Sequence, residues 1–268
     1  MNMEYIQLNN GIKMPSIGFG VYQIPLLMTK QCVLDALAIG YRHIDTARNY
    51  GNEREVGEAL IDSGISRAEI FLTTKIYGAD SYRQACQYID EALNKLQTKY
   101  IDLMLFHWPS GNITETYRAM EDYYKAGKLK AIGLSNFFIH DLNTVISSCT
   151  IIPMVNQVEA HIFHQRKVFQ KDMNQYGIKL EAWSPLACGK NNIFGNLILE
   201  KIAKSHRKST AQVALRFLNQ KGIAIIPKSI HKDRIKENWE IFDFELTNDE
   251  MKEIELLDCD CSLFSWYE

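Results

Sequence analysis

Four side chains in the first half of the chain could together move a proton. Asp45, Lys75 and His107 each come at the end of a short apolar run, and Tyr50 follows Asp45 by five residues. We expect the carboxylate to keep a buried lysine charged, and the ammonium to stabilise the phenolate and lower the pKa of the tyrosine. A neutral imidazole can donate a hydrogen bond to a carbonyl oxygen. These residue types predict a site that protonates an oxygen while another group attacks its carbon.

Each of the four side chains also has a simpler interpretation. Asp45 could cap a following helix, and Lys75 could be a solvated charge at a strand end. His107 could be a structural histidine, and Tyr50 could pack its ring and leave its hydroxyl wet. These interpretations are independent of one another, whereas a shared site explains all four positions together.

The four side chains can meet only if the elements before them end at one place. The sequence alternates short apolar runs with longer helical patterns, which is typical of a parallel sheet with crossover helices. Eight strands are predicted, at residues 17–20, 41–45, 70–74, 101–107, 131–134, 154–159, 178–183 and 223–227. This number favours an α/β fold of the (β/α)8 barrel type, in which active sites lie at the carboxyl ends of the strands.

Local signals predict the other elements. Two apolar segments flank Asn9-Asn10-Gly11, which indicates an N-terminal β-hairpin at one end of the barrel. Apolar residues spaced by three and four predict a helix over 81–96. Further predicted features are a helix over 114–126 capped by Thr114, a capping box at 66–69, a helix over 193–205 and a helix that begins at Ser209.

Length and composition narrow the class of protein. A chain of 268 residues with 46% hydrophobic residues can form one domain over 1–268 with a large core. The net charge of -2 disfavours nucleic-acid binding, and no apolar run approaches the roughly 20 residues that span a bilayer. The N-terminus lacks the pattern of a signal peptide, and the six cysteines include no C-x-x-C pair. We therefore expect a cytoplasmic protein with reduced thiols and no membrane partner.

Two weak motifs are set aside. Cys259-Asp260-Cys261 could be half of a metal site, but no second pair matches it, so two loop thiols and no metal are expected. Gly18-Phe19-Gly20 could begin a dinucleotide-binding fingerprint, but Gln23 stands where the third glycine should be.

The residues around the four side chains resemble those of a known family. Residues 45–53, Asp-Thr-Ala-Arg-Asn-Tyr-Gly-Asn-Glu, resemble the D-x-A-x-x-Y-x-N-E signature of the aldo-keto reductases. The resemblance continues in order through Thr74-Lys75, His107-Trp108-Pro109, Gly133-Leu134-Ser135-Asn136-Phe137, Asn156-Gln157-Val158-Glu159, Trp183-Ser184-Pro185-Leu186 and Ile226-Pro227-Lys228-Ser229. It implies a (β/α)8 barrel, NADPH-dependent reduction of aldehydes and ketones, and a catalytic tetrad of Asp45, Tyr50, Lys75 and His107.

The same resemblance implies where the cofactor binds. Ser135, Asn136 and Gln157 match positions that bind the nicotinamide carboxamide, and Trp183 matches an aromatic that stacks on the ring. Lys228 and Arg234 match positions that bind the 2′-phosphate, so we expect NADPH over NADH. The complete predicted set of cofactor-binding residues is Gly20, Val21, Tyr22, Asp45, Ser135, Asn136, Gln157, Trp183, Ser184, Leu186, Lys228, Ser229, Arg234, Glu237 and Asn238.

The substrate is predicted from the rim of the barrel. The loop after Trp183 and the tail over 261–268 are short, which resembles bacterial-type reductases of small aldehydes, dicarbonyls and keto sugars such as diketo-gluconate and methylglyoxal reductases. The predicted substrate contacts are Tyr22, Tyr50, His107 and Trp108. We also expect a monomer.

Two other functions remain open at this point. The first is a non-catalytic NADP-binding regulatory subunit of the same fold. The second is a barrel isomerase or aldolase in which Lys75 forms a Schiff base, although a lysine paired with a carboxylate is charged and a poor nucleophile.

Overall fold

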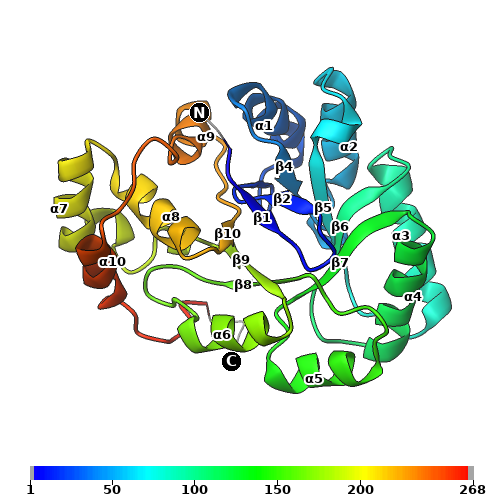
Figure 1. The fold of residues 1–268 in the computed structure, drawn as a ribbon. Coiled ribbons are helices and arrows are strands. Elements are labelled where there is room, and N and C mark those ends of the chain that lie inside the picture. Colours follow the sequence, from blue (N-terminus) through cyan, green and yellow to red (C-terminus); the bar gives the residue numbers. More distant parts are fainter. Residues whose placement is uncertain (1–2, 265–268) are drawn as a thin grey trace.

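The central sheet is a closed barrel. The computed structural model describes residues 3–264, and in these residues eight parallel strands follow one another around the sheet in chain order. Figure 1 shows the barrel that they form. The strands are β3 (Phe19–Gly20), β4 (His43–Asp45), β5 (Phe71–Ile76), β6 (Ile101–Phe106), β7 (Leu129–Ser135), β8 (Val155–Glu159), β9 (Lys179–Trp183) and β10 (Ala224–Ile225). A parallel bridge between Ile17 and Ile225, with Gly18 N donating to Ile225 O at 2.8 Å, joins the first strand to the last. The predicted (β/α)8 barrel is confirmed.

The N-terminal hairpin covers one end of this barrel. Strands β1 (Tyr5–Gln7) and β2 (Lys13–Pro15) pair antiparallel, with Ile6 opposite Met14. In the turn between them, Asn9 Nδ2 donates to Pro153 O and Asn10 Nδ2 donates to Lys130 O. These acceptors precede or begin β8 and β7, so the hairpin lies at the amino ends of the strands and leaves the carboxyl ends open.

Helices surround the barrel (Figure 1). They are α1 (Leu26–Ile39), α2 (Glu53–Asp62), α3 (Tyr82–Lys95), α4 (Ile113–Lys125), α5 (Ile139–Ser148), α6 (Lys167–Gln175), α7 (Leu197–His206), α8 (Thr210–Gln220), α9 (Lys232–Trp239) and α10 (Asn248–Glu255). The predicted helices over 81–96 and from Ser209 are present as α3 and α8. Ser81 caps α3, and Ser209 caps α8 in a complete capping box with Gln212. Within residues 3–264, every helix is too short or too polar to span a bilayer.

Three local predictions were wrong. The predicted capping box at 66–69 is a single 3-10 turn, η2 (Arg67–Glu69), and the Ser66 side chain makes no capping bond. Helix α4 begins before Thr114, because Asn112 accepts from Glu115 N and so supplies the cap two residues earlier. The predicted helix over 193–205 is split into η4 (Ile193–Gly195) and α7, because Asn196 caps the second segment.

The strand boundaries also differ in detail. Lys75 lies inside β5, which continues to Ile76, whereas a strand ending at residue 74 was expected. Strand β10 has only two residues, fewer than the predicted 223–227. Proline lacks an N–H, so Pro227 cannot donate to a neighbouring strand, although its carbonyl oxygen accepts from Gly20 N at 3.2 Å. Of the predicted C-terminal tail, residues 265–268 lie outside the described part of the chain.

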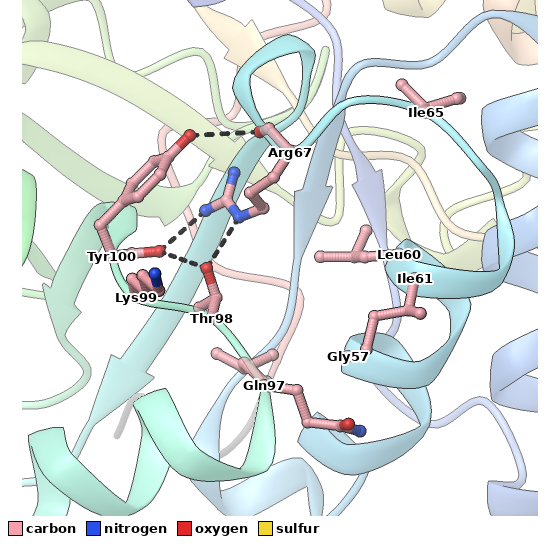
Figure 2. A pocket seen from close by; sticks show the side chains of 10 residues that line it. Gly57, Leu60, Ile61, Ile65, Arg67, Gln97, Thr98, Lys99 and Tyr100 are labelled. Atoms are coloured by element: carbon pink, nitrogen blue, oxygen red, sulfur yellow. Dashed lines mark hydrogen bonds between the residues drawn. The ribbon is translucent and has the colours of Figure 1, made fainter.

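A groove at the amino end of the barrel lies away from these strand ends. It has a volume of about 390 Å³ and is lined by residues of α2 and by the loops that precede β5 and β6. As Figure 2 shows, Arg67 sits beside it and bonds to Thr98 and Tyr100. Arg67 also pairs with Asp102 Oδ2 at 2.7 Å. This arrangement joins two loops, so Arg67 serves the fold rather than a ligand.

Candidate active site

Parallel strands bring the four predicted catalytic side chains to one end of the barrel. Asp45 is the last residue of β4, and Lys75 lies two positions beyond the residue of β5 that pairs with it. His107 follows β6 directly. Tyr50 ends the 3-10 helix η1 (Arg48–Tyr50), which begins shortly after β4. Side chains alternate across a strand, so Asp45 and Lys75 point into the barrel at the carboxyl end.

Lys75 is the centre of the cluster. Its Nζ donates to Asp45 Oδ1 at 2.6 Å, to the carbonyl oxygen of Thr46 at 3.0 Å and to the Tyr50 hydroxyl at 3.2 Å. An ammonium has three N–H groups, so these acceptors use all of them. The Lys75 side chain is 0% exposed. A buried cation with every donor paired is held both in position and in its charged form.

The pKa shifts in this cluster follow from burial and from Lys75. Desolvation would lower the pKa of Lys75, but the Asp45 carboxylate reverses this and the net direction is upward. Burial raises the pKa of Tyr50 to about 12, and Lys75 only partly opposes it. The expected net acidification of Tyr50 was therefore wrong. The phenol keeps its proton at neutral pH, and Lys75 acts on the phenolate that forms when the proton leaves.

His107 completes the group as a neutral imidazole. Burial lowers its pKa to about 3, and Lys75 acts in the same direction. Its ring centroid lies 5.8 Å from that of Tyr50 and 5.1 Å from that of Tyr77. A neutral ring in this place can donate one hydrogen bond to an oxygen held beside Tyr50.

The loop that carries Tyr50 is fixed by buried polar side chains. Asn52, 1% exposed, donates to Val21 O at 3.1 Å and accepts from Thr46 Oγ1 at 2.8 Å. Glu53, also 1% exposed, accepts from Thr74 Oγ1 at 2.7 Å. The Asn and Glu of the 45–53 motif are thus supports for the site, a role that the sequence interpretation had not given them.

The predicted nicotinamide-binding residues form a network on the next three strands. Asn136 Nδ2 donates to His107 O and to Ser135 Oγ, both at 3.1 Å, and Asn136 Oδ1 accepts from Trp183 Nε1 at 2.8 Å. Asn136 has a φ of 61°, a left-handed conformation that asparagine tolerates better than most residues. Gln157 Nε2 donates to Asp45 Oδ2 at 2.9 Å, which links these strands to the catalytic cluster.

Comparisons with known proteins identify the family. The model of the aldo/keto reductase family matches residues 17–258. The chain belongs to this family. It is 44% identical to a glyoxal reductase of Bacillus subtilis, with 96% of this chain and 94% of that protein covered. It is 42% identical to a 9,11-endoperoxide prostaglandin H2 reductase of Trypanosoma cruzi, with 97% and 94% covered.

Solved structures agree with the family assignment. An aldo-keto reductase from a Medee basin deep-sea metagenome library superposes with a TM-score of 0.94 at 42% identity, and 97% of each chain is covered. This aldo/keto reductase is therefore an oxidoreductase that reduces carbonyl groups of small substrates with a nicotinamide cofactor. The regulatory-subunit alternative has no support from these relatives.

The other residues predicted to contact the nicotinamide end of the cofactor lie at or just after the carboxyl ends of β3, β6 and β9. Gly20 has no room for a side chain, because a Cβ there would lie 2.9 Å from Ile226 O. Tyr22 is 49% exposed, and its ring lies 4.8 Å from that of Tyr50. The other predicted residues at this end are Val21, which is buried, and Trp108, Trp183, Ser184 and Leu186, which are half-buried.

The predicted phosphate and adenine residues lie after β10 and on α9. Lys228 and Arg234 are exposed, and neither forms an ion pair with any residue in 3–264. Ser229 is buried and accepts from His231 N at 3.1 Å. Glu237 is half-buried, and Asn238 is buried. Two cations that no carboxylate neutralises suit an anionic group, so these residues fit a cofactor phosphate.

The described part of the tail lies beside the mouth. Ser262 Oγ donates to Glu159 Oε2 at 2.6 Å, and Leu263 N donates to Glu159 Oε1 at 3.0 Å. Phe264 packs edge-on against Trp183, with ring centroids 5.2 Å apart. The tail is therefore anchored at the end of β8 and supports the aromatic ring of Trp183.

One buried acid was missed by the sequence interpretation. Glu181 is 0% exposed on β9 and accepts from Gln157 Nε2 at 2.7 Å. It stands between Leu180 and Ala182 in an apolar run. The available signal was a lone acid within an apolar run, because carboxyl groups are seldom fully buried without a partner.

Proposed function

We propose that this aldo/keto reductase uses NADPH to reduce small aldehydes, dicarbonyls and keto sugars, with Tyr50 as the general acid. The observation that carries the proposal is the Lys75 ammonium, which bonds at once to Asp45 and to the Tyr50 hydroxyl. The ammonium interacts more strongly with the phenolate that forms as Tyr50 loses its proton than with the neutral phenol. It therefore stabilises the transition state more than the ground state, as catalysis requires.

The proton step follows from this geometry. The substrate oxygen lies between Tyr50 and His107, where His107 donates a hydrogen bond that orients it. NADPH, when bound, supplies the hydride to the carbonyl carbon. As negative charge builds on the oxygen, the Tyr50 O–H bond breaks and its proton forms the new alcohol O–H. Lys75, held by Asp45, then faces a phenolate that regains its proton from solvent.

The same contacts disfavour Schiff-base chemistry. A lysine can attack a carbonyl only as a free amine. Lys75 is charged and has all three donors engaged among the described residues. Borohydride treatment with substrate and without NADPH should therefore leave the mass of the protein unchanged.

The preference for NADPH rests on Lys228 and Arg234. NADH has no 2′-phosphate, so it would leave both exposed cations without an anionic partner. Arg234→Ala should raise the KM for NADPH by about tenfold, since a charge-assisted hydrogen bond to phosphate is lost, while the KM for NADH stays the same. Arg83→Ala, which removes an arginine from the distant helix α3, is the matched control. Equal effects on both cofactors would contradict the assignment.

A substrate panel tests the function as a whole. Purified protein is given aldehydes, dicarbonyls and keto sugars with NADPH or NADH, and loss of reduced-cofactor absorbance is followed. The similarity to a glyoxal reductase favours turnover of small dicarbonyls. Steady turnover with NADPH supports an enzyme, whereas cofactor binding without turnover of any carbonyl would support a regulatory subunit.

We also propose that residues 1–268 form one domain that acts as a cytoplasmic monomer and does not bind nucleic acid. The family match over 17–258 and the net charge of -2 support this. Light scattering coupled to gel filtration should give the mass of one chain, 30.9 kDa. A mass twice as large would contradict the monomer.

A further inference from the structure

The amide of Gln157 has a fixed orientation. Its Nε2 donates one N–H to Asp45 Oδ2 at 2.9 Å and the other to Glu181 Oε2 at 2.7 Å. A side-chain amide has two N–H groups, so both are used. None of the hydrogen bonds among residues 3–264 involves Gln157 Oε1. The oxygen is therefore the one polar atom that Gln157 can offer to a ligand.

Glu181 accepts one of these two hydrogen bonds from the interior of the barrel. Its carboxyl is fully buried, and Oε1 accepts no hydrogen bond from the described residues. His43 Nε2 lies 3.7 Å from Oε1, and that nitrogen lies 2.9 Å from Thr73 Oγ1. Lys75 is engaged with Asp45 rather than with Glu181.

We propose that Glu181 is a positioning residue for the nicotinamide end of the cofactor. Together with Asp45 it takes both N–H groups of Gln157, and so makes Gln157 an acceptor for the N–H2 group of the cofactor carboxamide. This role rests on the proposed NADPH site, and it places one further condition on the ligand. The ligand must present a hydrogen-bond donor to Gln157.

The surrounding charges indicate that Glu181 does this as a neutral acid. The titratable groups around it are Asp45 and His43 on β4 and Lys75 on β5. Burial raises the pKa of Glu181 to about 8, and the negative charge of Asp45 acts in the same direction. His43 is neutral, because burial lowers its pKa to about 3. A neutral Glu181 still accepts from Gln157 and leaves the charge balance of Lys75 and Asp45 undisturbed.

The first test compares two ligands on one variant. Glu181→Met keeps an unbranched side chain but removes the acceptor. We expect it to weaken NADP+ binding by about tenfold, since Gln157 then has a free N–H and can turn its amide. The probe that isolates the effect is the 3-acetylpyridine analogue of NADP+, which has a methyl group in place of N–H2. Its affinity should change less than about threefold, because it has no donor for Gln157.

Three controls separate a positioning role from a structural one. Glu181→Gln retains an acceptor and should bind NADP+ like the wild type. Gln157→Ala combined with Glu181→Met should be no weaker than Gln157→Ala alone, since both changes act through one amide. Glu121→Gln replaces a buried carboxyl that bonds to Thr150 N and Ile151 N instead, and it should leave the affinity unchanged.

The outcomes are distinguishable. Equal weakening of NADP+ and its analogue by Glu181→Met would show a structural role and overturn the proposal. If that variant does not fold, the affinities of the wild type for NADP+ and for its analogue are compared instead. Equal affinities would exclude an acceptor at Gln157. A wild type that binds neither ligand would instead refute the proposed function. A separate measurement tests whether Glu181 is protonated. The rate of reduction by the wild type should fall above pH about 8, and the rate of reduction by Glu181→Gln should not.

Discussion

Replacing Lys75 with Met tests whether one ammonium organises both the stability and the chemistry of the site. The change removes the 2.6 Å bond to Asp45 Oδ1 and leaves that carboxylate buried, 2% exposed, with Gln157 as its remaining partner. An uncompensated buried charge costs about 3–5 kcal/mol of the free energy of unfolding. Asp45→Asn should cost a similar amount, because it leaves the buried ammonium without its counter-ion.

The double variant Asp45→Asn/Lys75→Met gives the decisive comparison. It removes both charges, and the asparagine side chain at position 45 can still accept from Gln157. Its loss of stability should therefore be smaller than the sum of the two single losses by at least about 2 kcal/mol. Urea denaturation at neutral pH measures the three losses against the wild type. Stability returns in the double variant but activity does not, because it still lacks the charge that stabilises the phenolate, and kcat should fall by about 100-fold or more.

Two results would refute this reasoning. A Lys75→Met protein within about 1 kcal/mol of the wild type would show that the pair is not a buried charge pair in solution. Strictly additive losses would show that Asp45 and Lys75 do not act on each other.

Three further changes have predicted results. Arg67→Met should lower the free energy of unfolding by about 2–4 kcal/mol, because two backbone carbonyls lose the Arg67 donor and Asp102 loses its counter-ion and keeps Leu72 N as a donor. The kcat in the carbonyl assay should stay unchanged, and a loss of activity in the folded variant would contradict the structural role of Arg67. Gly57→Ala should cost about 1–3 kcal/mol by calorimetry, since a Cβ there would lie 2.7 Å from the Leu96 backbone, and an unchanged Tm would contradict the tight packing of α2. In the folded chain Glu181 keeps its proton up to pH about 8, whereas in the unfolded chain it releases the proton near pH 4.5. The free energy of unfolding of the wild type should therefore fall by roughly 2–4 kcal/mol between pH 4.5 and pH 8, relative to that of Glu181→Gln. The same pH dependence of stability in both proteins would exclude a protonated Glu181.

Much of the barrel could be predicted from sequence because its strands are buried on both faces. Apolar runs such as the one before His107 are easy to recognise. The carboxyl ends of parallel strands lie at the same edge of a sheet, so Asp45, Lys75 and His107 could be placed at one site. Helix starts could not be placed from the sequence alone. Thr114 and Asn112 are both good caps, and only the contact with Glu115 N decides between them.

The electrostatics of the site could not be read from residue types. Lys75 next to Tyr50 indicates a lowered pKa of the phenol, but the depth of burial decides whether the net shift of that pKa is downward or upward. A sequence does not give the depth of burial. Glu181 was missed for a related reason. In a strand buried on both faces the alternation of polar and apolar residues is lost, so the pattern does not reveal that residue 181 faces the barrel interior beside Gln157.

The central claim is that Tyr50 gives its proton to the substrate oxygen. Tyr50→Phe removes one oxygen and leaves the buried Lys75–Asp45 pair in place. The affinity for NADPH should then stay within about threefold of the wild type, while kcat for a small dicarbonyl falls by about 100-fold or more. A Tyr50→Phe enzyme that binds NADPH normally and keeps full turnover would contradict the account.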